Sequence, residues 1–432
     1  AIAYERRSGE YSRFHQLMKL LLFHPSSAYF TCPLAMTDGA ARVLETIDAK
    51  EVREMTFHHL IAREGAEFWT AGQWMTEKTG GSDVSKTETV AELINGQYFL
   101  SGTKWFTSAI TAEVALTLAR TTHPESGKEG LSMFFVKLRD SKGQLNNIEV
   151  LRLKDKLGNR AMPTAELELK KCPATLIGNY NEGVKNISTV LNISRIYNAV
   201  CAVGAMYRLI SLSKDYSQKR EAFDKKLSQH PLHTTTLFDW QTQINASLHF
   251  ISQLALYMGK AETGKADEVE QALLRLYTPI AKLWTGKHCV QLMSELIESF
   301  GGAGYIEDTG LPKFLRDNQV LSIWDGTTNI LSLDTLRAMS KGNVLELSLS
   351  AMAQRIENLD SFENEKQKLL SHLQQAQKFI QKNNSSRPLM EAGARSLAFV
   401  LGDIFTALLM CEFALNTKNK RDQVMAERYC HK

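Results

Sequence analysis

The order in which hydrophobic periodicity changes along the chain restricts the fold more than any other feature. Residues 15–23 and 39–47 carry apolar residues at three-to-four spacing, which indicates helices. Residues 72–178 change to the alternating or continuous apolar runs that are typical of strands. From Gly183 onward the helical spacing returns. The sequence therefore predicts an α+β protein, mainly α, with a β-domain between two helical regions.

The β-region has its clearest signal in a hairpin. Residues 90–94 and 97–100 flank Asn95-Gly96, and Asn-Gly is favoured in two-residue turns because both positions need a positive φ. We expect further strands at residues 114–118, 131–136 and 165–169.

The C-terminal half predicts long helices. One face of the first carries Ile187, Val190, Leu191, Val200, Val203, Tyr207 and Ile210. Others are expected at residues 236–258, 267–300, 344–382 and 388–417, with Pro279 inside the second of these four and Gly301-Gly302 stopping it.

Composition excludes several classes of function. A net charge of +4 on 432 residues does not predict nucleic-acid binding, and the short basic run 418–421 is better explained as a solvated helix end. The six cysteines form no C-x-x-C pair and no zinc-type cluster, so we expect no metal site and a reducing intracellular compartment. No apolar run looks long enough to span a membrane, because residues 397–410 are interrupted by Gly402 and Asp403.

Five short segments could carry chemistry. They are residues 74–83, 102–108, 219–227, 299–305 and 321–330. In the first, small residues and hydroxyls would let backbone N–H groups approach a phosphate or a flat cofactor. In the second, Trp105 and Thr107 are two apart and are expected on one strand face. Taken singly, the first four segments are better explained as a loop, a core aromatic on a strand, a solvated charge run and a helix C-cap.

Asp325 is the carboxylate with the strongest functional case. It follows an apolar run, precedes Gly326 and stands just before a helix start expected at Thr327 or Thr328. Asp325 would be either a cap residue or a general base at a helix entrance.

Together, the order and spacing of the five segments, with Lys156-Leu157-Gly158 between them, resemble the acyl-CoA dehydrogenase family over residues 30–340. The family's T-E-x-x-x-G-S-D, W-x-T, R-x-x-F, F-G-G and E-G-T stretches correspond to residues 76–83, 105–107, 220–223, 300–302 and 325–327. The residues around Thr76, the tryptophan before Asp325 and the C-terminal extension look most like the alkylation-response (AidB-like) branch and its long animal relatives.

The resemblance implies a domain order. It comprises an N-terminal helical domain at residues 1–71, a central β-domain at 72–180, a four-helix bundle at 181–342 and a helical extension at 343–432. Because few residues precede the first motif, we expect the N-terminal domain to be incomplete. The resemblance also implies a homodimer or homotetramer, with electron-transfer flavoprotein as the candidate electron acceptor.

The family's chemistry implies FAD and a fatty acyl-CoA. Positions implied to meet FAD are Met75, Thr76, Ser82, Trp105, Phe106, Thr107, Arg220, Phe223, His230, Glu298, Gly301, Gly302, Thr327 and Asn329. Positions implied to meet the acyl-CoA are Ser82, Asn192, Arg195 and Gly326. By this resemblance Asp325 removes the α-proton of the thioester while hydride passes from the β-carbon to flavin N5.

Three positions depart from the family's pattern. The base is usually glutamate and here it is Asp325; Glu298 stands where glutamine is usual, and Asp224 where glycine is usual. The shorter base leaves a second hypothesis open, namely a flavoprotein that binds or sequesters acyl-CoA with little turnover. A DNA-associated flavoprotein, suggested by the alkylation-response branch, is a lesser alternative that the charge disfavours.

Overall fold

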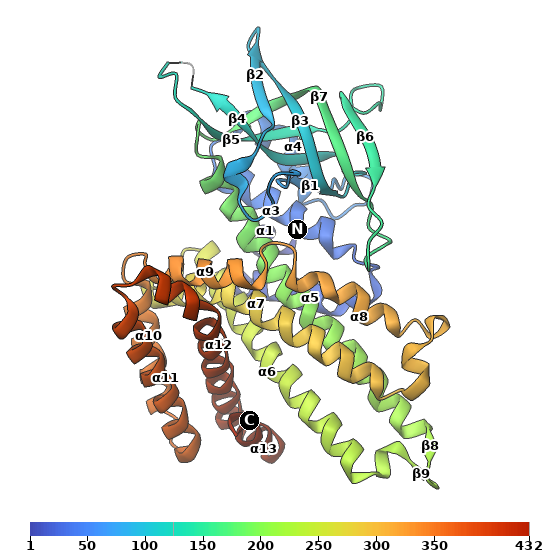
Figure 1. The fold of residues 1–432 in the computed structure, drawn as a ribbon, viewed down its shortest axis with the longest axis vertical. Coiled ribbons are helices and arrows are strands. Elements are labelled where there is room, and N and C mark those ends of the chain that lie inside the picture. The colour runs from blue at the N-terminus through green and yellow to red at the C-terminus, as the bar shows by residue number, and fades with distance from the viewer. Residues whose placement is uncertain (124, 432) are drawn as a thin grey trace. The chain divides into compact units, whose positions relative to one another are not determined.

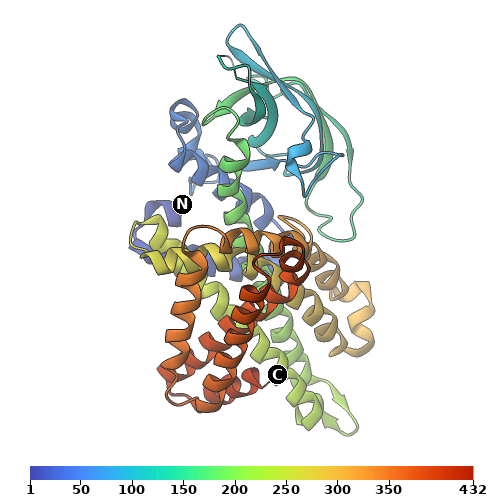
Figure 2. The same cartoon turned by 60° about the vertical axis from the view of Figure 1, so that its left-hand side comes forward.

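The computed structural model describes residues 1–123 and 125–431, so Lys432 of the predicted extension lies outside the described part. The chain forms two compact units (Figures 1 and 2). The first unit holds Ala1 and residues 26–197, and the second holds residues 2–25 and 198–432. The long helix α5 (Gly183–Lys219) begins in the first unit and continues into the second.

The first unit is built on a β-sheet with two helices beside it. The helices are α3 (Thr31–Thr46) and α4 (Lys50–Leu60), and the strands are β1 (Ala71–Trp74), β2 (Val90–Ile94), β3 (Gln97–Ser108), β4 (Val114–Thr122), β5 (Glu129–Lys137), β6 (Ile148–Leu153) and β7 (Thr164–Ile177), with the 3-10 turn η3 at Val84–Lys86. The Thr37 hydroxyl of α3 accepts the N–H of Ala71 at 2.9 Å, which fixes α3 to β1.

The sheet closes on itself. The pairings β4–β2, β2–β3, β3–β7, β7–β5 and β5–β4 form a ring, with β1 added to β4 and β6 to β7. Figure 2 shows these strands curving around a common interior, which is filled by buried residues such as Trp74, Leu100, Phe134 and Leu167. Because the sheet closes, few backbone N–H and C=O groups are left unpaired at a free edge.

The expected hairpin is confirmed. Val90–Ile94 pairs antiparallel with β3, and Asn95 and Gly96 have φ values of +49° and +83°. Strands were also expected within β4, β5 and β7, as found. β1 and β6 were not expected; β6 has one buried residue among six, so its sequence lacks the apolar alternation of a half-buried strand.

The second unit is helical. Besides the rest of α5 it contains α1 (Ile2–Glu5), α2 (Ser12–Phe23), α6 (Pro231–Glu262), α7 (Glu268–Glu298), α8 (Pro312–Asn318) and α9 (Thr328–Met339). Short elements within it are β8 (Glu221–Ala222), β9 (Lys225–Lys226), η1 (Gly9–Tyr11), η2 (His24–Ser26), η4 (Leu227–Gln229), η5 (Gly301–Tyr305), η6 (Glu307–Thr309) and η7 (Gln319–Ser322). A capping box of Asp267 and Glu270 starts α7, and Pro279 lies inside it.

The C-terminal extension corrects one expectation. The single helix predicted over residues 344–382 is two helices, α10 (Val344–Glu357) and α11 (Glu363–Asn383). The chain turns at residues 358–362, where Leu359 and Phe362 are 1% and 3% exposed. Their burial anchors the turn in the core, a tertiary effect that helical periodicity cannot reveal. Two further helices follow, α12 (Arg387–Thr417) and α13 (Lys420–Cys430).

The extension shares a core with the rest of the second unit. The Trp284 indole of α7 donates to the Asp403 carboxylate of α12 at 2.7 Å. The rings of Tyr277 and Phe405 stack, with centroids 4.1 Å apart. These contacts make α12 part of the same folded body as α7.

Two helices are long and apolar enough to cross a membrane by length and composition, α5 and α12. This corrects the expectation that no segment qualifies, because α12 meets the criterion with Gly402 and Asp403 inside it. However, 78% and 72% of the two apolar windows are buried inside the fold, as in core helices.

Candidate functional site

The loop after β1 holds the first predicted segment. Met75 is buried, Thr76 is half-buried and Ser82 is exposed. The loop is tight, since a Cβ on Gly81 would lie 3.2 Å from Cγ2 of Thr76 and one on Gly80 would lie 2.7 Å from the carbonyl oxygen of Asp83. Within residues 1–123 and 125–431, the Thr76 and Ser82 hydroxyls have no hydrogen-bond partner. Both are therefore available to a ligand.

The second segment corrects the expected strand face. β3 contains an irregularity between Lys104 and Thr107, where three steps on β3 match two on β7. The Lys154 ammonium lies 3.5 Å from the ring centroid of Trp105 and 4.9 Å from that of Phe106. Two consecutive rings thus meet one cation, which regular alternation would prevent. The bulge breaks the period of two, so the spacing of Trp105 and Thr107 does not place them on one face.

The residues of this segment differ in exposure. Trp105 is half-buried and Phe106 is 56% exposed. Thr107 is fully buried, and its hydroxyl donates to the Ala165 carbonyl at 2.7 Å. The Thr107 oxygen keeps lone pairs that can accept a further hydrogen bond.

The two segments are joined by contacts that sequence reasoning missed. The N–H of Trp105 donates to the carbonyl of Thr76 at 2.9 Å. Glu77, inside the first segment, forms a buried ion pair with Lys104, which immediately precedes Trp105. Their position next to motif residues was the only available signal, since charged residues beside loops and strands usually face solvent.

The two predicted substrate residues on α5 differ in exposure. Asn192 is exposed, whereas Arg195 is 9% exposed. Their spacing of three places them on neighbouring positions of the helix surface.

In the second unit, Asp325 stands in a turn of unusual backbone conformation. Asp325 has φ +54° and Gly326 has φ +107°, both in the region that favours glycine. The Lys282 ammonium of α7, which is fully buried, donates to the Gly326 carbonyl at 2.6 Å. The N-cap residue of α9 is Thr327, so Asp325 does not occupy the cap position.

A second side chain fixes the approach to this turn. Asn198 of α5, which is 3% exposed, donates through Nδ2 to the Leu321 carbonyl at 3.0 Å and accepts from the Trp324 indole N–H. The residue before Asp325 is thereby tied to α5. Sequence reasoning missed both Asn198 and Lys282, because a lone polar residue on an apolar helix face has no recognisable motif.

The third segment forms a two-residue hairpin between β8 and β9. Phe223 and Asp224 have φ +51° and +60°, so aspartate occupies a left-handed position that glycine takes more easily. The Phe223 side chain is 90% exposed. The His230 ring contacts the Ala222 carbonyl at 3.0 Å and secures the hairpin, while Arg220 is exposed.

The remaining predicted positions are also at the surface. Glu298, Gly301, Gly302, Thr327 and Asn329 are exposed. A Cβ on Gly301 or Gly302 would meet nothing within 4 Å, so that surface is open. Asn329 is hydrogen-bonded to Arg395 of the extension at 3.0 Å. Among the described residues, no group of three or more His, Cys, Asp or Glu is arranged for a metal ion.

The chain matches three family models along most of its length. Residues 72–172 match the acyl-CoA dehydrogenase middle domain and residues 181–340 the acyl-CoA dehydrogenase C-terminal domain. Residues 343–432 match the acyl-CoA dehydrogenase 11 C-terminal domain-like model.

Individual relatives agree with these matches. The chain is 43% identical to acyl-CoA dehydrogenase family member 11 of Caenorhabditis elegans over 97% of this chain and 71% of the relative. It is 34% identical to the putative acyl-CoA dehydrogenase AidB of Escherichia coli, of whose length it spans 62%. The crystal structure of C. elegans ACDH-11 in complex with C11-CoA superposes with a TM-score of 0.92 at 42% identity, covering 98% of this chain and 74% of that one. The chain belongs to the acyl-CoA dehydrogenase family.

Proposed function

We propose that the protein is an FAD-dependent dehydrogenase that oxidises a fatty acyl-CoA between its α and β carbons. FAD is the cofactor of the family to which the chain belongs. In the first unit, the free hydroxyls of Thr76 and Ser82 suit such a group. In the second unit, considered by itself, Gly301-Gly302 leaves open space above its backbone. The proposed cofactor contacts are Met75, Thr76, Ser82, Trp105, Phe106, Thr107, Arg220, Phe223, His230, Glu298, Gly301, Gly302, Thr327 and Asn329.

The observation that carries the proposal is the Asp325 turn. A left-handed backbone at a residue other than glycine costs of the order of 1 kcal/mol or more. Here Lys282 and Asn198, both buried, hold the backbone on either side of it. Such support is expected where a reacting group must be kept in place.

In this mechanism Asp325 acts as the general base. Its half-buried carboxylate accepts the α-proton, and the loss of that proton is favoured when hydrogen bonds polarise the thioester carbonyl. The acceptor for the hydride that leaves the β-carbon would be supplied by FAD held by the contacts proposed above. Asn192, Arg195, Ser82 and Gly326 are the proposed acyl-CoA contacts.

A second function is an acyl-CoA-binding flavoprotein with little turnover. Aspartate is one methylene shorter than the family's usual glutamate, about 1.5 Å less reach. A misplacement of about 1 Å can cost about a hundredfold in rate. The relative ACDH-11 was crystallised with C11-CoA, which supports acyl-CoA binding under either function.

Further assignments belong to the same proposal. We propose a homodimer or homotetramer, with electron-transfer flavoprotein as electron acceptor. A reducing compartment is proposed because none of the six cysteines forms a disulfide in the part of the chain that the structure describes.

The test is flavin bleaching by C11-CoA without oxygen, on the parent and on Asp325→Asn. Asparagine tolerates the left-handed conformation and cannot accept the α-proton, so FAD content should survive and reduction should fall at least about a hundredfold. Asp325→Glu should keep or raise the parent's rate. If Asp325→Asn reduces its flavin as fast as the parent, another group is the base. If the parent binds C11-CoA and never bleaches, the binding function is the correct one.

A further inference from the structure

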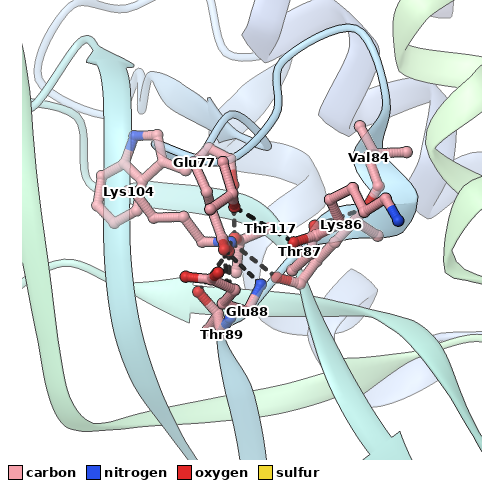
Figure 3. Close-up of polar contacts among 11 residues, drawn as sticks. Glu77, Val84, Lys86, Thr87, Glu88, Thr89, Lys104 and Thr117 are labelled. Carbon is pink, nitrogen blue, oxygen red and sulfur yellow. Dashed lines mark hydrogen bonds and ion pairs between the residues drawn. The ribbon is translucent and has the colours of Figure 1, made fainter.

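The first unit contains a buried ion pair at the base of the loop that follows β1. Nζ of Lys104 lies 2.6 Å from Oε1 of Glu77 and donates to the Leu118 carbonyl at 2.9 Å. Lys104 is fully buried and Glu77 is 4% exposed. Figure 3 shows the two side chains pointing toward each other from the loop and from β3.

Glu77 also closes the loop on itself. Its carboxylate accepts the Thr89 hydroxyl at 2.6 Å and the Thr89 N–H at 3.3 Å, and the N–H of Glu88 donates to it as well (Figure 3). Residues 77 and 89 are thereby held together at the two ends of the loop. One carboxylate thus determines the loop's span, and one ammonium fixes that loop to β3.

The pair therefore couples the two proposed cofactor segments of the first unit. Glu77 follows Met75 and Thr76 directly, and Lys104 directly precedes Trp105. The 2.9 Å bond from the Trp105 N–H to the Thr76 carbonyl lies beside the pair. A shift of either side chain would move both segments.

Stability alone does not account for this arrangement. Burying two charges costs desolvation, and well-packed apolar residues often stabilise a fold as much as a buried ion pair does. Such a pair instead supplies a directional constraint, because a charged hydrogen bond fixes two backbones at a set distance.

We propose that Glu77 and Lys104 are positioning residues for the flavin, which hold the loop at residues 75–83 and the bulge at residues 105–107 in the spacing that binds FAD. This rests on FAD being the cofactor and does not depend on turnover of acyl-CoA.

The experiment measures the affinity of the 432-residue chain for FAD, by the flavin fluorescence that appears when the holoprotein is diluted. Glu77→Gln with Lys104→Met removes both charges together and keeps a carbonyl oxygen for Thr89. This double variant should fold, by circular dichroism, and its dissociation constant for FAD should rise at least about tenfold, or about 1.4 kcal/mol. An unchanged constant would overturn the proposal.

The matched control is Arg355→Met with Glu412→Gln. That pair joins α10 to α12 in the second unit, with Nη2 and Oε2 2.6 Å apart. The affinity of this control variant for FAD should stay within about twofold of the parent's, whatever the stability of the variant. An equal loss in the control would mean that FAD affinity follows general stability, and the proposal would be wrong.

Thr89→Val is a milder variant for the case in which the double variant does not fold. It removes only the hydroxyl that donates to Glu77, with little change of volume. FAD release should still be faster than from the parent by about threefold or more, and an unchanged release rate overturns the proposal. If the parent itself takes up no FAD, both the cofactor assignment and this inference fail. If the parent binds FAD but never oxidises acyl-CoA, only the proposed reaction fails.

Discussion

Lys282 decides how the candidate base is presented. It lies inside α7, is fully buried and donates to the carbonyl of Gly326, the residue after Asp325. A buried donor to a strained turn restricts the turn to one conformation, because losing that bond would leave a carbonyl unsatisfied. The conformation of Asp325 thus depends on a residue more than forty positions away in the chain.

Replacement of Lys282 by methionine should therefore lower the rate of flavin reduction more than it lowers acyl-CoA affinity. A displacement of the turn by about 1 Å would reduce the rate by about a hundredfold. Lys282→Arg keeps a donor and should recover part of the rate. Stopped-flow reduction by C11-CoA, with FAD content measured in parallel, checks this.

Lys287→Met is the matched control for that variant. Lys287 lies on the same helix and is partly exposed. Its rate should match the parent's. Equal rates for Lys282→Met and the parent would mean that the turn keeps its geometry without this ammonium.

At the scale of single elements, the helix α2 ends at a buried histidine. Burial there disfavours the positive charge that the helix dipole would favour. His24 follows the last residue of α2, where a cation is ordinarily favoured by about 0.3–1 kcal/mol. Burial outweighs this effect, because His24 is 2% exposed and desolvation lowers its pKa to about 3. The native protein therefore holds this imidazole neutral at any physiological pH.

This predicts a loss of stability in acid. The pKa of His24 is about 3 in the folded protein and 6.5 for the free side chain, so the unfolded chain takes up the proton first as pH falls. The contribution is fully present above pH 6.5 and is lost between there and pH 3. The free energy of unfolding should fall between pH 7 and pH 5 in the parent. In His24→Gln this fall should be smaller than in the parent by up to about 2 kcal/mol.

Urea unfolding at the two pH values measures the difference. His15→Gln, on the exposed side of the same helix, should show the parent's dependence on pH. A parent and a His24→Gln variant that lose equal stability between pH 7 and pH 5 would contradict the expected neutral state.

For the whole molecule, the second unit leaves large apolar side chains in solvent. Phe223, Leu232 and Tyr305 are 90%, 81% and 87% exposed. Phe223 is also held in a left-handed conformation that is uncommon for a bulky residue. Large exposed aromatics of this kind are typical of association surfaces.

We therefore expect the chain to self-associate through exposed side chains such as Phe223. Phe223→Glu would place a charge in the interface and should shift the protein toward the monomer. Sedimentation velocity at micromolar concentration measures the change, and Leu389→Glu is a control at another exposed apolar position, which is 56% exposed in the extension. A parent that is monomeric and still retains FAD would refute the expectation.

The sequence by itself determined the class of fold and the family. Period-two and period-3.6 patterns depend only on neighbouring residues, so these patterns could predict the hairpin at Asn95-Gly96, the helices α5, α6, α7 and α12, and the start of α9. The motif spacing was likewise sufficient to identify the family, which the domain matches confirm.

Only the tertiary structure decided which residues support the motifs. The bulge in β3 depends on pairing with β7, and the break between α10 and α11 depends on the burial of Leu359 and Phe362. Nothing in the sequence indicates that Lys104 and Lys282 are buried, because lysine usually faces solvent. They are buried because partners distant in the chain, Glu77 and the Gly326 carbonyl, satisfy them, and local patterns carry no information about such long-range contacts.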